Sequence, residues 1–187
     1  LVSSFFRFNY AYNNKYIAAI SSRWDGSSRF GANNKWGYFP AASVAWRISE
    51  ESFLDNADWI SELKIRASYG STGNNNIGDY SSLAVVSPGA NMYFGGAYQG
   101  FYQTNIANPN LSWEKTSEFD LGLDFGILDG RVALGIDYYD IRTDQLLLNR
   151  EVPSITGFTN SWTNMGLVKN SGFEFEVKSY NVCIDDV

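Results

Sequence analysis

Four carboxylates alternate along residues 113–125 and are the side chains of this sequence best suited to acid–base chemistry. They are Glu114, Glu118, Asp120 and Asp124. In an extended strand, Glu118 and Asp120 lie about 6.7 Å apart on one face, near the lower limit for the carboxyl pair of an inverting glycosidase. Such a pair also needs one carboxyl group whose pKa is raised by apolar surroundings, and the sequence carries no signal of them. We therefore expect the face that carries these four carboxylates to be water-exposed and not catalytic.

A second group of candidate residues is aromatic and lies in the two longest connections, among Gly and Asn. The group consists of Tyr93, Phe94, Tyr98, Phe101, Tyr102 and Trp162. Exposed aromatic rings present flat apolar faces with polar edges, which suits stacking on sugar rings or packing under a partner protein. The same rings could instead pack on each other and order a long loop. The sequence leaves both interpretations open.

The sequence lacks the residues that usually support metal binding, disulfide formation or nucleic-acid binding. The 187 residues contain no His and one cysteine, Cys183, so the commonest transition-metal ligand, an internal disulfide and a cysteine metal cluster are all excluded. Asp55, Asn56 and Asp58 do not have the spacing of an EF-hand calcium loop. The 20 acidic residues outnumber the 14 basic ones, which argues against a nucleic-acid partner. We predict no enzyme, no cofactor and no metal site.

The element with the most regular pattern is residues 35–48. Its even-numbered positions carry the apolar side chains Trp36, Tyr38, Val44 and Trp46. The ten steps from Trp36 to Trp46 span about 33 Å, which a tilt of roughly 40° projects to about 25 Å, the height of the apolar band of an outer-membrane barrel. A soluble strand averages only about 5 to 6 residues. Pro40 cannot donate to a strand ladder, so we expect a local bulge there.

Six further stretches alternate with the same period of two. They are residues 1–12, 16–24, 63–69, 113–125, 132–138 and 173–177. The connections at 13–15, 49–61 and 126–130 are mostly shorter than those at 25–34, 70–112 and 143–168. Outer-membrane barrels have short periplasmic turns that alternate with long extracellular loops, so we place the connection at 70–112 outside the cell. One helical turn is expected within residues 50–58.

These patterns predict an all-β fold, an antiparallel meander of about seven long strands that forms a partial segment of a large transmembrane β-barrel. No apolar run approaches the roughly 18 residues that a membrane helix needs. Seven strands cannot close such a barrel, and an open edge in lipid would leave backbone groups unsatisfied, so we expect a piece of a larger protein with a missing N-terminus. One face should carry Trp36, Tyr38, Pro40, Val44, Trp46, Trp113, Phe119, Leu121, Leu123 and Phe125.

The alternative is a soluble extracellular β-sandwich that binds carbohydrate. Such a fold would also alternate and could also be rich in aromatic residues. It would show turn signals every 8 to 12 residues or so, whereas a barrel shows longer strands with aromatic residues at both ends. Strand length therefore favours the barrel.

Several ordered motifs resemble one known family. They are N-K-W-G-Y-F-P-A-A-S-V-A-W-R-I-S-E-E-S-F (34–53), L-K-I-R-A-S-Y-G-S-T-G-N-N-N-I-G-D-Y (63–80), N-P-N-L-S-W-E-K-T (108–116), F-G-I-L-D-G-R-V (125–132) and N-M-G-L-V-K-N-S-G-F-E (164–174). Together they resemble the SusC/RagA family of TonB-dependent outer-membrane transporters, and the resemblance covers almost the whole chain.

The resemblance implies a barrel of about 22 strands with a plugged lumen, in the lipid of the cell outer membrane. It further implies a SusD-like lipoprotein lid that captures oligosaccharides or peptides, and opening by TonB through a plug region that these residues lack. Residues 1–180 would form part of the barrel, and residues 181–187 an atypical or truncated end. The resemblance would place Glu114, Glu118, Asp120 and Asp124 on the lumen wall.

Overall fold

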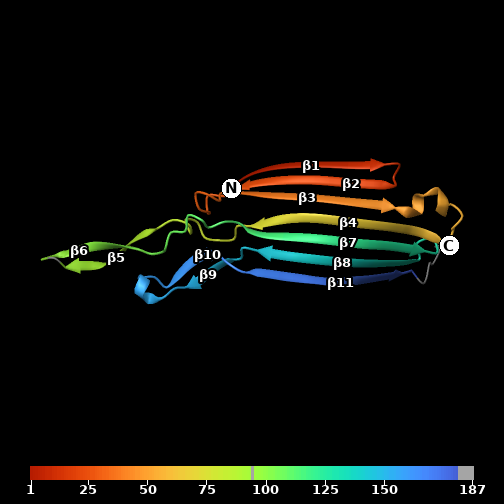
Figure 1. Ribbon diagram of the computed structural model, residues 1–187. Helices are drawn as coiled ribbons and strands as arrows, with labels where there is room; N and C mark the ends of the chain where they lie inside the picture. The colour runs from red at the N-terminus through yellow and green to blue at the C-terminus, as the bar shows by residue number, and fades with distance from the viewer. Residues whose placement is uncertain (94, 181–187) are drawn as a thin grey trace, which may run out of the picture.

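The computed structural model describes residues 1–93 and 95–180 (Figure 1). Seven strands form one antiparallel sheet in which each strand pairs with the next long strand of the chain. In order across the sheet they are β1 (Val2–Tyr12), β2 (Tyr16–Gly26), β3 (Trp36–Arg47), β4 (Ile60–Asn74), β7 (Glu114–Ile127), β8 (Val132–Asp144) and β11 (Leu167–Ser179). The expected meander of seven long strands is confirmed.

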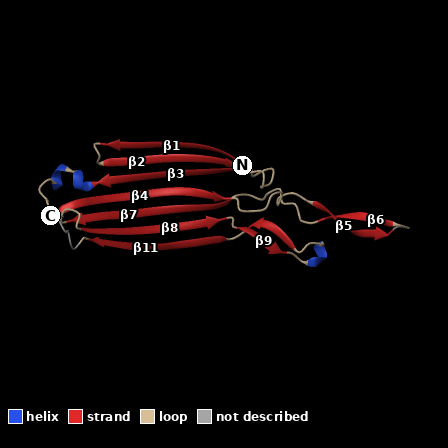
Figure 2. Cartoon of the chain, turned by 180° about the vertical axis from the view of Figure 1, so that it is seen from behind, coloured by secondary structure: helices blue, strands red, loops and turns tan. Residues whose placement is uncertain are grey.

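Two small hairpins project beyond one end of this sheet, in connections that the sequence pattern does not resolve into strands (Figures 1 and 2). They are β5 (Val86–Tyr93) with β6 (Ala97–Gln103), and β9 (Leu147–Glu151) with β10 (Asn160–Asn164). Strands β4 and β8 also run further toward this end than expected. We call it the loop end, and the opposite end the turn end.

The turn end holds the connections from β1 to β2, from β3 to β4 and from β7 to β8. Asn13 and Asn14 take φ values of 49° and 58° between β1 and β2, a left-handed conformation that Asn tolerates and that matches the twist of a tight hairpin. The connection from β3 to β4 contains the 3-10 turns η1 (Ile48–Glu50) and η2 (Ser52–Leu54), close to the expected helical turn. A third 3-10 turn, η3 (Ser154–Thr156), lies at the loop end. Among the described residues, no helix is long and apolar enough to cross a membrane.

The register divides the sheet into an apolar face and a polar face. One row of neighbours across the apolar face joins Ala18, Val44, Ala67, Leu121 and Tyr138. Most large apolar side chains on this face are exposed rather than buried. The expected members Trp36, Tyr38, Val44, Trp46, Phe119, Leu121 and Leu123 all lie on it, since they occupy alternate positions of β3 and β7.

The sandwich alternative is wrong. The main sheet is a single layer, and the two hairpins lie beyond its end rather than against a face (Figures 1 and 2). In the part of the chain that the structure describes, no second sheet covers the apolar face. Trp36 accordingly keeps 65% of its surface exposed and Leu121 keeps 45%. A contiguous exposed face of this kind is characteristic of strands that meet lipid.

Pro40 causes no bulge, contrary to expectation. The pairing of β2 with β3 continues through Ser22 and Pro40 without a shift. The pairing of β3 with β4 begins only at Ala41 and Gly70, so Pro40 lies where β3 has no ladder partner on that side. A missing N–H at an edge position leaves the ladder intact.

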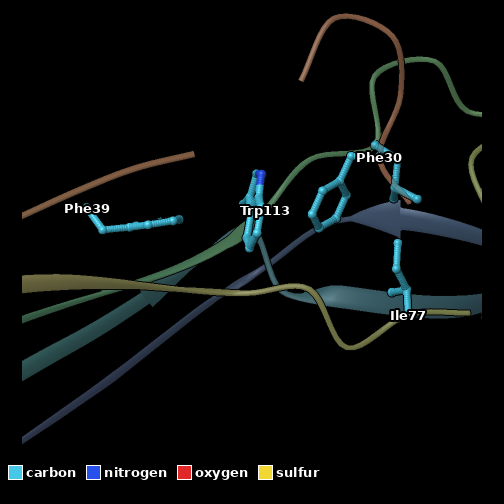
Figure 3. Packing of buried hydrophobic residues seen from close by; sticks show 5 residues of the cluster. Phe30, Phe39, Ile77 and Trp113 are labelled. Atoms are coloured by element: carbon cyan, nitrogen blue, oxygen red, sulfur yellow. The ribbon is translucent and has the colours of Figure 1, made fainter. Parts of the chain in front are cut away.

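Trp113 is also placed differently from the prediction. It directly precedes β7 and is only 7% exposed, within a small core formed by Phe30, Phe39, Ile77, Leu111 and Trp113. Figure 3 shows its ring between Phe39 and Phe30, with centroid distances of 5.5 Å and 4.9 Å. The alternation of β7 does not extend to Trp113 because the chain has left the pleated strand there. We call these five residues the loop-end core.

The Glu51 carboxylate connects several segments at the turn end of the sheet. Glu51 accepts hydrogen bonds from the Tyr16 hydroxyl at 2.7 Å, the Trp46 indole N–H at 3.1 Å and the Lys15 ammonium at 3.2 Å. Donation from Tyr16, then from Trp46 and Lys15, holds the pKa of the Glu51 carboxyl below its ordinary value, against a smaller opposing effect of burial. The β3–β4 connection is thereby fastened to the β1–β2 turn.

This contact predicts a pH-dependent stability. A carboxyl group whose pKa is lower in the folded state stabilises the fold at pH values above its unfolded pKa, about 4.3, and the contribution is lost as the pH falls through the folded pKa. We expect Glu51→Gln to lower the free energy of unfolding of the complete protein near pH 7. The difference in free energy of unfolding between the variant and the parent protein should disappear in acid. Denaturant unfolding in lipid across this pH range measures it.

The matched control for this experiment is Glu50→Gln. Glu50 forms a partly exposed ion pair with Arg47 at 3.0 Å, and such pairs contribute little. The loss of stability for Glu50→Gln near pH 7 should be smaller than the loss for Glu51→Gln. If the stability difference between Glu51→Gln and the parent protein stays constant down to strongly acid pH, the ionised Glu51 does not have the stabilising role assigned to it.

Candidate functional site

The four predicted carboxylates all lie on the polar face of β7, because they occupy alternate positions of one strand. They do not share one environment. Asp124 contacts the Lys64 ammonium at 2.8 Å and the Arg66 guanidinium at 3.3 Å. Asp120 lies 3.8 Å from Arg66. The structure thus pairs two of the four carboxylates with cations of β4.

Arg66 is the centre of this ion network. Its guanidinium also contacts Asp137 of β8 at 2.7 Å, so it links β4, β7 and β8 across the polar face. Gly122 makes room for it, since a Cβ built on Gly122 would lie 2.6 Å from the Arg66 Cζ atom. Lys64, Arg66 and Asp137 were not among the residues predicted from the sequence. Their alternation with apolar residues was the available signal, but their partners follow only from the register.

The other two carboxylates have different surroundings. Glu114 accepts hydrogen bonds from the Leu147 backbone N–H at 2.9 Å and from the Asn74 amide at 3.1 Å. It therefore anchors the start of β9 to the main sheet. Glu118 is exposed and lines an open depression of the polar face together with Asp120, Asp137 and Glu174. The network therefore suits a polar, charge-compensated wall, and it lacks the apolar surroundings that a catalytic acid needs.

The predicted aromatic residues divide into two groups. Tyr93, Tyr98, Phe101 and Tyr102 belong to the β5–β6 hairpin and are between 57% and 77% exposed. Alternation along β6 puts Tyr98 and Tyr102 on one face of the hairpin and Phe101 on the other. None of the ring pairs among the described residues involves them. Phe94 lies outside the described residues, as do residues 181–187.

Trp162 has a different setting. It is partly buried and packs against the loop-end core. Its carbonyl oxygen accepts a hydrogen bond from the Asn108 amide at 3.0 Å. The neighbouring Asn164 accepts a hydrogen bond from the Ser112 N–H at 2.7 Å and donates to the carbonyl oxygens of Ser112 and Gln145 at 2.8 and 3.0 Å. The β9–β10 hairpin is thus fastened at its base.

Sequence comparison assigns the chain to a family. Residues 2–182 match the family model described as "TonB dependent receptor-like, beta-barrel". The chain is 42% identical to the TonB-dependent receptor SusC of Bacteroides thetaiotaomicron, over all of this chain and 19% of that protein. It is 41% identical to TonB-dependent receptor P3 of Formosa agariphila, again over all of this chain and 19% of that protein.

Structural comparison agrees. The RagAB peptide importer in its "closed-closed" state superposes with a TM-score of 0.87 and 34% identity, over 98% of this chain and 20% of that one. The siderophore receptor PirA from Pseudomonas aeruginosa superposes with a TM-score of 0.62 at 14% identity, over 94% of this chain and 30% of that one, which shows the shared fold alone.

The chain spans about a fifth of the length of the SusC and RagAB relatives that it matches. The matched part is barrel, and the exposed apolar face and charged polar face of the sheet are those of a barrel wall. The chain therefore belongs to the family of TonB-dependent receptor β-barrels, which are outer-membrane transporters and not enzymes, and it forms part of a SusC/RagA-type barrel.

Proposed function

We propose that this chain forms part of the wall and the extracellular loops of an importer that takes up oligosaccharides or peptides together with a SusD-like lipoprotein. One observation carries the proposal: long strands with an exposed apolar face and an ion-paired polar face, in a chain similar to SusC and to the RagAB peptide importer. Residues 1–180 would be the barrel portion, and TonB would act through a plug elsewhere in the complete protein.

The length of the connections supports the orientation. The turn end holds the connections at residues 13–15, 48–59 and 128–131, and the loop end holds those at 27–35, 75–113 and 145–166. Long extracellular loops and short periplasmic turns are the rule in such barrels. The β5–β6 and β9–β10 hairpins would then project outside the cell, where a lid protein or cargo could meet them.

The polar face would line the lumen. Glu118 and Asp120, together with the ion pairs of Asp124 and the anchoring contacts of Glu114, would provide a hydrated surface against the plug. Because the cations of β4 compensate Asp120 and Asp124, these carboxylates suit a structural role better than direct capture of cargo. The exposed aromatic residues of the β5–β6 hairpin are the better candidates for contact with cargo or lid.

Uptake by two aromatic variants tests this assignment. We expect Tyr98→Ala in the complete transporter to reduce uptake about fivefold at normal outer-membrane abundance, since one aromatic contact contributes roughly 1 kcal/mol. Trp162→Ala should instead loosen the packing at the loop end and lower the abundance of folded protein. Growth on the cognate nutrient, normalised to the amount of transporter in the outer membrane, measures both.

The control is Tyr80→Ala, because Tyr80 is exposed in the same connection but lies outside the hairpin. Normal uptake with both Tyr98→Ala and Tyr80→Ala would show that the hairpin aromatic residues contact neither cargo nor lid. Supplying the nutrient as a peptide in one culture and as an oligosaccharide in another separates the two cargo classes.

A further inference from the structure

The charged side chains of the apolar face are confined to one place. Among the seven main strands as described, they occur only at the loop end of β7, β8 and β11. They are Lys115, Asp140, Arg142, Asp144 and Lys169. The rest of this face carries apolar or small polar side chains, so the cluster needs an explanation of its own.

The boundary of the apolar band runs obliquely across the strands. From the row that joins Ala18 to Tyr138, uncharged side chains continue toward the loop end as far as Trp24 on β2, whereas β8 becomes charged directly after Tyr138. Toward the turn end the band stops at Tyr16 on β2 but continues to Val132 on β8. The band therefore shifts toward the turn end between these two strands.

This shift gives the strand tilt. It amounts to about five residues, or roughly 16 Å along the strands, over four strand spacings of about 4.8 Å each. The normal of a membrane that follows the band then makes an angle of about 40° with the strands, within the range of strand tilts in outer-membrane barrels. The apolar band and the bilayer thus coincide only in a tilted sheet.

The tilt places the cluster just outside the hydrocarbon region, still on the lipid side of the wall. Arg142 lies four residues beyond Tyr138, which a 40° tilt converts to about 10 Å of height. Headgroups occupy roughly 5 to 7 Å beyond the hydrocarbon on each side, and the long side chains of Lys and Arg can reach back toward them. Phe119 and Phe173 lie below the cluster, where acyl chains would lie.

The ion pairing within the cluster leaves positive charge available. Arg142 and Asp144 form a bidentate pair at 2.7 and 3.0 Å. Lys169 faces Arg142 directly across the strands, and like charges in that position repel unless an anion lies between them. Within residues 1–93 and 95–180, neither Lys115 nor Lys169 forms an ion pair.

We propose that Lys115, Arg142 and Lys169 bind the phosphate group of a lipid headgroup in the outer leaflet. The inference rests on the proposed function, because that function sets which end of the sheet faces outward. Ammonium and guanidinium groups complement a phosphate, and the apolar residues below the cluster would hold the acyl chains of the same molecule. A free phosphate ion would use the cations only.

The test is lipid retention by the complete transporter. The probe is an acylated disaccharide that carries one phosphate, supplied in detergent and counted on the protein by native mass spectrometry. We expect the double variant Lys115→Gln/Lys169→Gln to retain roughly 30-fold less of it, since each cation near a charged headgroup contributes about five- to sixfold. Arg7→Gln, which removes an exposed cation of the polar face, should retain it normally.

Three results would overturn the inference. They are equal retention by the double variant and the parent protein, equal retention of the same glycolipid without its phosphate, and complete displacement by excess inorganic phosphate, which would indicate a site for the free anion. Uptake by the same variants separates this inference from the proposed function. If the double variant loses lipid retention and the uptake of nutrient stays normal, the result supports both the lipid-binding inference and the proposed function. If the parent protein retains the lipid but imports no nutrient, only the proposed function is contradicted.

Discussion

Replacing Leu121 with Arg in the complete transporter is expected to lower its free energy of unfolding in a bilayer by about 2 to 4 kcal/mol. Leu121 lies on the apolar face, in the row that contains Ala67 and Tyr138, and 45% of its surface is exposed. Because apolar side chains on this face of β7 run from Phe119 to Phe125, Leu121 lies within the apolar band, and a guanidinium there would have to leave water for hydrocarbon. Denaturant unfolding in lipid vesicles measures the loss.

The control is the neighbouring residue on the opposite face. Asp120 lies 3.8 Å from Arg66 in a partly exposed ion pair, which contributes at most about 1 kcal/mol. Asp120→Asn should therefore be mild. Equal losses for Leu121→Arg and Asp120→Asn would mean that the two faces meet similar surroundings, and the assignment of the apolar face to lipid would be wrong.

Replacing Trp113 with Ala is expected to cost about 3 to 5 kcal/mol, as for other large aromatic residues in a packed core. The ring packs between Phe30 and Phe39, and its indole N–H donates to the Lys35 carbonyl oxygen at 3.2 Å. Its loss would leave a cavity at the point where the two small hairpins join the sheet. We expect the loop end to become sensitive to added protease while the barrel remains folded.

Trp36→Ala is the matched control, because Trp36 is also a tryptophan at the loop end but is 65% exposed on the apolar face. It should change protease sensitivity little. If both variants become equally sensitive, the loop-end core does not hold the hairpins. Limited proteolysis of outer-membrane preparations, compared with unfolding in lipid, distinguishes local loosening from loss of the barrel.

The sequence by itself determined the strands of the sheet and their two faces. Side chains in a strand alternate with a period of two, so Trp36 and Trp46 must share one face of β3, and Glu118 and Asp120 must share one face of β7. The absence of His and the single Cys likewise exclude most catalytic chemistry. These conclusions depend only on local geometry and composition, and both can be read directly from the chain.

Only the tertiary structure decided which residues meet across the sheet. Arg66 reaches Asp124 and Asp137 because β4, β7 and β8 pair in one register, although the residues are 58 and 71 positions apart. Trp113 joins the loop-end core because the chain leaves the strand just before β7, where alternation no longer predicts direction. The sequence pattern did not predict the β5–β6 hairpin because Pro88 and Gly89 interrupt the alternation of β5 at a bulge. Contacts of this kind depend on strand pairing, which a single sequence does not contain.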